Sequence, residues 1–209
     1  MAKLAMNKSM LHKERERLSL YQRVLPSLDL KRRQLILEAG RARKALVQSQ
    51  DEIKRLNTDI GEQLPMLAAE ETEVGGLVQV ESVELGEENI VGVELPVLKD
   101  VQCAVRDYAL LAKPHWVDVL VDRLREGAIL RVTEQIMAER VRLLDYAVRR
   151  TTQRINLFEK ILIPTAKTNI QRIRIFLGDA ERAAIVRAKI SKALQQRQQQ
   201  EIAVEGEML

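Results

Sequence analysis

The fold is decided by residues 25–53, LPSLDLKRRQLILEAGRARKALVQSQDEI, in which Leu25, Ala39, Leu46 and Ile53 share one seven-residue spacing. The row extends in both directions without a change of phase, and only one of its positions is charged. Its members are Leu4, Leu11, Leu18, Leu25, Arg32, Ala39, Leu46, Ile53, Ile60 and Leu67. A seven-residue repeat of this length predicts one long helix over residues 1–67, with an apolar seam that faces a partner helix.

Two features weaken this first helix. The companion row, three residues further on, contains the polar residues Asn7, Glu14 and Ser49. Pro26 removes one backbone hydrogen bond, so residues 1–67 form either two helices or one kinked helix. We expect one continuous kinked helix, because the seven-residue row keeps its phase across Pro26.

An acidic middle segment follows at residues 68–115. Its runs Val78–Leu85 and Ile90–Leu95 alternate apolar and polar residues on either side of Gly86–Asn89. This pattern predicts a β-hairpin over about residues 78–95, with its turn at Gly86–Asn89. A small helix is expected at Leu98–Ala112, before Lys113 and Pro114.

A second long helix is predicted over residues 116–194, followed by a frayed tail at 195–209. Its best seven-residue row comprises Val141, Val148, Ile155, Leu162, Asn169, Phe176, Ala183 and Ile190. Pro164 interrupts this helix without ending it, either as a surface kink or as a built-in bend. The expected fold class is all-α: a long antiparallel two-helix coiled coil with a short β-hairpin and a small helical segment between the long helices. Leu46, Ile53, Ile155 and Leu162 are the expected seam residues.

Composition excludes several classes of protein. Charged residues make up 31% of the 209 residues and aromatic residues 3%, which is typical of long helices that bury only a narrow stripe. One cysteine, Cys103, cannot form an internal disulfide, and no apolar run is long enough to span a membrane or to form a signal peptide. We therefore expect a cytoplasmic protein with no direct membrane insertion.

Charge is segregated along the chain. Residues 1–69 hold 14 Lys and Arg against 8 Asp and Glu, whereas residues 70–107 hold 2 against 10, and residues 108–209 hold 18 against 12. The ends are therefore basic and the middle acidic, which predicts different partners for them.

No catalytic, cofactor-binding or metal-binding motif is present. His12 and His115 stand alone, and Cys103 is interpreted as a small buried residue. The sequence predicts a protein that is not an enzyme by itself and that carries no cofactor.

Basic runs occur at Lys31–Arg33, Arg41–Lys44 and Arg149–Arg150. They are either a solvated helix face with ion pairs between successive turns or a surface that meets an acidic protein. No aromatic residues are interleaved with these charges, so nucleic acid is not an expected partner.

Three segments resemble the D subunit family of V-type and A-type rotary ATPases. Leu28–Leu35 (LDLKRRQL) is similar to the family's Leu-x-x-Lys-Arg-x-x-Leu signature, and Asn89–Leu98 (NIVGVELPVL) is similar to its hairpin return strand. Arg154–Pro164 (RINLFEKILIP) resembles the Arg-Val-Asn-x-Leu-Glu-x-x-x-Ile-Pro stretch of its C-terminal helix.

The resemblance implies a central-stalk rotor component of a V/A-type ATPase or ATP synthase, peripheral to the membrane. Such a rotor transmits torque between the catalytic A and B subunits and the membrane rotor that moves protons or other ions. The implied partners are the A and B subunits of the head, the small F subunit, and the funnel subunit on the membrane rotor. The implied partner-contact residues are Lys31, Arg32, Arg43, Ile90, Val91, Gly92, Val93, Arg154, Asn156 and Glu159.

A static coiled-coil scaffold or adaptor is the alternative from another class of protein. The seven-residue rows alone are consistent with it. The predicted hairpin favours the rotor interpretation, because a plain tether needs no β element between its helices. The sequence leaves open whether the complex runs as a synthase or a pump, and whether it moves protons or sodium.

Overall fold

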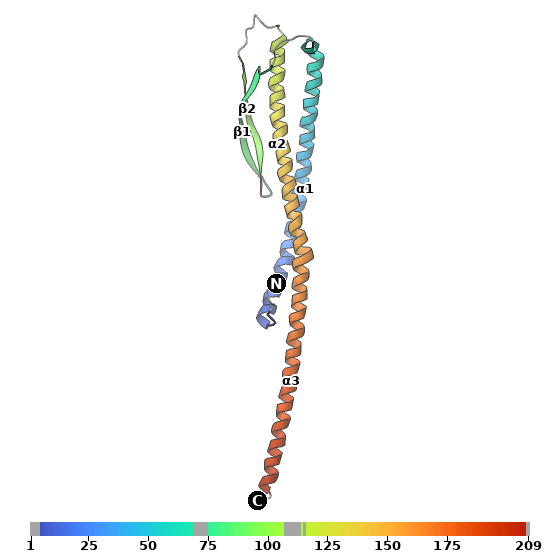
Figure 1. The fold of residues 1–209 in the computed structure, drawn as a ribbon, viewed down its shortest axis with the longest axis vertical. Helices are drawn as coiled ribbons and strands as arrows, with labels where there is room; N and C mark the ends of the chain where they lie inside the picture. Colours follow the sequence, from blue (N-terminus) through green and yellow to red (C-terminus); the bar gives the residue numbers. More distant parts are fainter. Residues whose placement is uncertain (1–4, 69–74, 107–113, 115, 208–209) are drawn as a thin grey trace. The chain divides into compact units, whose positions relative to one another are not determined.

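The computed structural model describes residues 5–68, 75–106, 114 and 116–207. The elements, shown in Figure 1, are α1 (Lys8–Gln63), the 3₁₀ turn η1 (Pro65–Ala68), β1 (Val78–Ile90), β2 (Val93–Val105), α2 (Trp116–Leu157), the π turn η2 (Phe158–Leu162) and α3 (Ile163–Glu207). The predominantly helical fold is confirmed. The antiparallel sheet formed by β1 and β2 makes an all-α description only approximate.

Helix α1 begins at an asparagine cap. Asn7 Oδ1 accepts a hydrogen bond from Met10 N at 2.7 Å, which satisfies one of the free N–H groups of the first turn. The helix then passes through Pro26 without interruption, so the two-helix alternative is wrong. Next to the proline, Ser27 Oγ donates to Val24 O at 2.8 Å.

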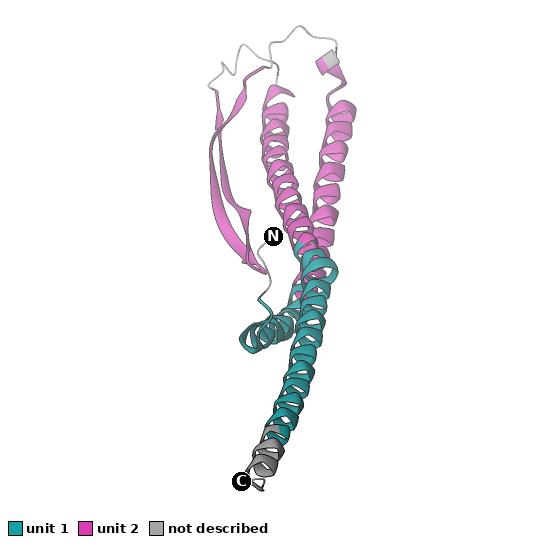
Figure 2. Ribbon diagram, turned by 60° about the horizontal axis from the view of Figure 1, so that its bottom comes forward, with its two compact units in different colours: residues 1–28, 154–209 teal, residues 29–153 magenta. Residues whose placement is uncertain are grey.

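The chain divides into two compact units, coloured separately in Figure 2. Unit 1 comprises residues 1–28 and 154–209, and unit 2 comprises residues 29–153. Each unit takes part of α1 and part of the C-terminal helices.

In unit 2 the α1 segment pairs antiparallel with α2. The residue number falls along α1 as it rises along α2 in successive contacts between the two helices. These are Arg123 Nη2 to Gln63 Oε1 at 3.4 Å, Gln50 Nε2 to Glu134 Oε1 at 3.1 Å, and Arg43 Nη2 to Asp145 Oδ1 at 2.6 Å.

In unit 1 the start of α1 pairs antiparallel with η2 and α3. The contacts are an edge-to-face stack of Tyr21 on Phe158 with ring centroids 5.4 Å apart, a hydrogen bond from Asn169 Nδ2 to Glu14 Oε2 at 3.4 Å, and an ion pair of Lys8 with Glu181 at 3.8 Å. Glu14 is only 4% exposed and also accepts from Arg17 Nη1 at 2.8 Å. A polar pair of this kind in the seam favours one register of the two helices over its neighbours.

The seam uses both rows of α1. Ile53 and Ile155 are buried as expected, while Leu46 and Leu162 are half-buried. The companion row, which the sequence makes the weaker one, is buried at Glu14, Leu35, Ala42, Ser49 and Leu56. The seam therefore contains small and polar residues as well as large apolar ones.

The π turn changes the phase of the seam on the C-terminal helices. Before it, Leu144, Thr151 and Ile155 are buried; after it, Ala166, Ile170 and Ile173 are buried. Thr151 and Ile155 therefore have their next equivalents at Ala166 and Ile170, fifteen residues on rather than fourteen. Ile163 N bonds to Phe158 O, the i to i+5 bond that inserts this extra residue. The predicted row beyond Leu162 is thus wrong: Asn169 is only half-buried and Phe176 is 51% exposed.

The hairpin turn lies at Val91–Gly92, and the expected turn at Gly86–Asn89 is wrong. Both turn residues have positive φ, 54° and 72°, as a two-residue primed turn requires, and Gly92 N donates to Asn89 Oδ1 at 2.9 Å. Gly86 lies instead inside β1, where the side chain of Lys99 approaches so closely that a Cβ would lie 2.7 Å from Lys99 Cε.

The expected helix at Leu98–Ala112 is also wrong over the residues that are described. Residues 98–105 belong to β2, where Leu98 pairs with Leu85 and Val101 with Val83. Residues 107–112 of that prediction lie outside the described residues. At the other end of the chain, α3 continues as a helix to Glu207.

The shifted phase predicts unequal effects of two matched substitutions in α3. Replacing Ile173, which is 0% exposed, with Asp should bury an unpaired carboxylate and lower the free energy of unfolding by about 3 kcal/mol or more. The control, Phe176→Asp, changes a residue that is 51% exposed and should cost about 1 kcal/mol or less. Urea unfolding of the isolated chain measures both. A larger loss for Phe176→Asp would show that the buried row follows the original seven-residue spacing through Phe176.

Candidate partner-binding surfaces

The tip of the hairpin packs on the helices of its own unit. Leu95 of β2 is fully buried in a cluster with Leu35, Ala39 and Ala42 of α1 and Leu144 of α2. Ile90, Val91 and Val93 pack against the same cluster. These three residues, expected as partner contacts, thus have a structural use within the chain. The cluster also holds Val91 at its unfavourable positive φ.

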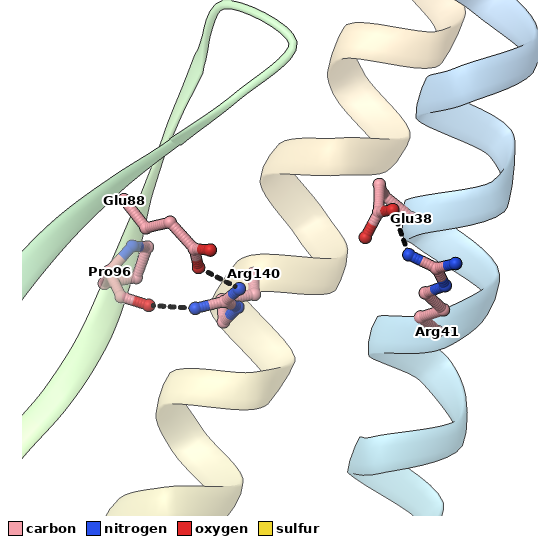
Figure 3. A network of polar contacts seen from close by, with 5 residues as sticks. All are labelled: Glu38, Arg41, Glu88, Pro96 and Arg140. Atoms are coloured by element: carbon pink, nitrogen blue, oxygen red, sulfur yellow. Dashed lines mark hydrogen bonds and ion pairs between the residues drawn. The ribbon is translucent and has the colours of Figure 1, made fainter.

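Arg140 of α2 fastens the hairpin from the side (Figure 3). Its guanidinium donates to Pro96 O at 3.1 Å and to Glu88 Oε2 at 2.9 Å, and its side chain is only 16% exposed. A charged hydrogen bond shielded from water is stronger than an exposed ion pair. Sequence reasoning missed this residue, because an arginine in a basic helix gives no sign of which strand it will contact.

The basic residues predicted on α1 have different environments. Lys31 is half-buried and its Nζ lies 3.3 Å from where a Cβ on Gly92 would stand, so the amine covers the exposed turn. Arg32 pairs with Asp29 one turn earlier. Arg43 is bound across to Asp145, and this hydrogen bond raises the pKa of the Arg43 guanidinium, which stays charged throughout the working pH range.

The third predicted group lies at the end of α2 and in the π turn. Arg154, Asn156 and Glu159 are all exposed. Ile155, between them, is buried in the seam. The structure thus separates a structural residue from three outward-facing polar ones, and these three are free to meet a partner.

An exposed apolar stripe on α3 lies beyond the part of the helix that pairs with α1. Lys8, the first residue of α1, pairs with Glu181, and residues 182–197 of α3 are all exposed. Among them Val186, Ile190 and Leu194 are more than half exposed and fall on one side of the helix. The seven-residue row predicted Ile190 as a seam residue, whereas in the structure it is exposed.

One described cleft lies in unit 2 between α1, α2 and the start of β1. It encloses about 440 Å³, and its two guanidinium groups are those of Arg123 and Arg131. Arg123 pairs with Glu126 and Arg131 with Glu134, so each cation already has a carboxylate partner on its own helix. Within the described residues no group of three His, Cys, Asp or Glu side chains could hold a metal ion. No described helix is long and apolar enough to cross a membrane.

The chain matches a known family along most of its length. A profile of the ATP synthase D subunit family covers residues 10–193. The chain belongs to this D subunit family. All three segments that carry the sequence resemblance fall inside the matched region.

Individual relatives of this D-subunit chain agree with the profile. The V-type ATP synthase D subunit of Borreliella burgdorferi is 34% identical over 193 residues, which cover 92% of this chain and 95% of the relative. The proteins of the same name from Chlamydia felis and Chlamydia caviae are 32% and 31% identical over 205 and 202 residues, covering 95% of this chain and 97% of each relative. The similarity thus extends over helices and hairpin alike.

The three segments of this D-subunit chain that resemble the family each contain part of a defined structural feature. Leu28–Leu35 ends on the buried Leu35, and Asn89–Leu98 contains the turn and Leu95, so both segments supply the cluster under the hairpin tip. Arg154–Pro164 contains the π turn.

Replacing Arg140 with Met should loosen the hairpin tip, because Pro96 O and Glu88 would lose a shielded donor. We expect a loss of about 2 kcal/mol in the free energy of unfolding and faster amide hydrogen exchange over residues 86–97. The matched control is Arg142→Met, since Arg142 is 73% exposed and, among the described residues, pairs with Glu139 on its own helix. That control should change stability by about 0.5 kcal/mol or less. Equal effects of the two variants would show that Arg140 does not hold the hairpin.

Proposed function

We propose that this D-subunit chain is the central-stalk rotor of a V-type rotary ATPase or ATP synthase. It would transmit torque between the catalytic A/B ring and the membrane rotor that translocates ions, and would not itself catalyse a reaction. The family match and the names of the relatives support this proposal. A peripheral position on the cytoplasmic side of the membrane complex fits the proposal.

The observation that carries the proposal is the free end of α3. From residue 182 to residue 197 every residue is exposed, and the apolar side chains Val186, Ile190 and Leu194 form one stripe. An amphipathic helix of this length is marginal in water without a cover. We assign the cover to the A/B ring, which would surround this end of the helix.

The charges of this end suit a surface that turns. Arg187, Lys189 and Lys192 are exposed on α3, and no described contact locks them to an acidic residue. Exposed charges form weak ion pairs that salt screens, so they can pass from one carboxylate of a surrounding ring to the next. A tight, buried ion pair would instead favour one orientation over all others.

Other partners are assigned to the remaining surfaces. We propose that the exposed Gly92 turn with Lys31, Arg32 and Arg43 lies close to the small F subunit. Arg154, Asn156 and Glu159 are proposed to face the head subunits. The end of unit 2 that contains η1 would meet the funnel subunit on the membrane rotor.

A reversible crosslink tests the proposal. In a Cys103→Ser background, Arg187→Cys on α3 would be bridged by oxidation to a cysteine placed on the A/B ring. The disulfide holds the rotor in one orientation but leaves the nucleotide sites intact. Coupled ATP turnover of the whole complex should therefore stop on oxidation and return on reduction. Capping the same cysteine with a small thiol is the control, and should leave turnover intact. A complete crosslink with unchanged turnover would favour the static scaffold instead.

A further inference from the structure

The hairpin carries an apolar face that is separate from its packed tip. Four consecutive apolar cross-strand pairs share this face. They are Leu85 with Leu98, Val83 with Val101, Val80 with Cys103, and Val78 with Val105. Paired residues of an antiparallel sheet lie on the same side, so the eight side chains form one continuous surface.

Two bulges keep these residues on one face. The register skips Glu81 in β1 and Lys99 in β2. Val80 and Val83 are three residues apart, so in a regular strand they would point to opposite sides, because side chains alternate. The bulge at Glu81 returns them to the same side. The bulges therefore preserve an apolar surface that strict alternation would have divided.

Near the tip, the opposite face of the sheet is the one that meets the helices. At the base of the hairpin, Val78 packs instead against the buried cluster around Trp116 and Val117 of α2. Alternation from Leu95 through its partner Glu88 places Leu95 on the other face from Leu85 and Leu98. On that other face, away from the tip, the pairs are Glu84 with Asp100 and Ser82 with Gln102, and Ser82 Oγ donates to Gln102 Oε1 at 3.1 Å. The apolar pairs are thus on the side of the sheet that Leu95 does not use.

This apolar face is only partly covered. Leu85 is 55% exposed, and Val80, Val83 and Val105 are between 38% and 42% exposed. A two-stranded sheet is marginally stable in water, and a contiguous apolar surface on a hairpin commonly marks an interaction site.

The charges around the face indicate what covers it. Residues 78–105 hold six carboxylates and a single lysine. Glu87 and Glu94 follow on the same face towards the turn, and both are exposed. A second copy of the hairpin would bring like charges together, which disfavours self-association.

We propose that the face formed by Val80, Val83, Leu85, Leu98, Val101, Cys103 and Val105 docks another protein of the same complex. The partner presents an apolar patch rimmed by lysine or arginine. This inference rests on the proposed function. It adds a contact on the apolar face of the strands to the contact proposed at the turn, where Val91 and Val93 pack in the chain's own core.

The substitution V80T/V83T/V101T tests the surface. Threonine has the shape and β-propensity of valine, so the hairpin should keep its fold while the face becomes polar. The probe is the ATPase complex stripped of this chain, to which the full-length chain is rebound. We expect the affinity to fall about tenfold or more. The control S82T/Q102T, on the opposite face, should rebind like the unchanged chain. Equal affinities for the two variants would overturn the proposal.

Cys103 gives a second readout without any substitution, because it is the only cysteine of the chain and lies half-buried on this face. Maleimide should label it in the free chain and lose access to it after rebinding. Rebinding with unchanged labelling would overturn the docking face while leaving the proposed function intact. Failure of the unchanged chain to rebind would overturn both. Protection of Cys103 in the free chain, together with a dimer mass, would assign the face to a second copy and overturn the proposal.

Discussion

The apolar seam between α1 and the C-terminal helices is the interaction on which the rest of the structure depends. In unit 2 it buries Leu35, Ile53 and Leu144, and in unit 1 it buries Ile170 and Ile173. Neither partner would be a stable helix in water at this length without the other's apolar stripe. The hairpin is secondary to the seam, since its tip is held by side chains of the two helices that have already been brought together. A break in the seam would therefore release the hairpin as well.

The π turn reconciles this seam with Pro164. A proline has no N–H group, and its ring clashes with the carbonyl four residues earlier, which here belongs to Lys160 inside η2. The wider π turn accommodates this position by adding one residue to the helix, and the buried row then moves from the phase of Ile155 to that of Ile170. The π turn thus absorbs the missing N–H group and the ring clash of Pro164, and the helix continues beyond it. π turns occur frequently at functional positions, and this one lies within a segment shared with the family.

Much of the fold could be predicted from the sequence, because a seven-residue repeat specifies a helix pair and its seam directly. The phase of the buried row beyond Leu162 could not be predicted, because a seven-residue repeat gives no sign of a one-residue insertion. Pro164 is the only hint of it in the sequence. The hairpin was predictable from alternation, but its turn was not: Val91 adopts a positive φ that only its packing in the Leu95 cluster sustains. The bulge at Lys99 broke the alternation of β2 and allowed a helical interpretation. Among the partner-contact residues, sequence could not separate Val93, which packs inside the chain, from the exposed Arg154.

The proposed function requires that this chain turns within its complex. The most direct measurement is single-molecule rotation, with the A/B ring fixed to a surface and a probe attached to an E84C/C103S chain, since Glu84 is exposed on the polar face of the hairpin. On addition of ATP we expect stepwise rotation in one direction, which ceases when ATP is removed. A probe that stays at one angle while the same complexes hydrolyse ATP at their full rate would contradict it.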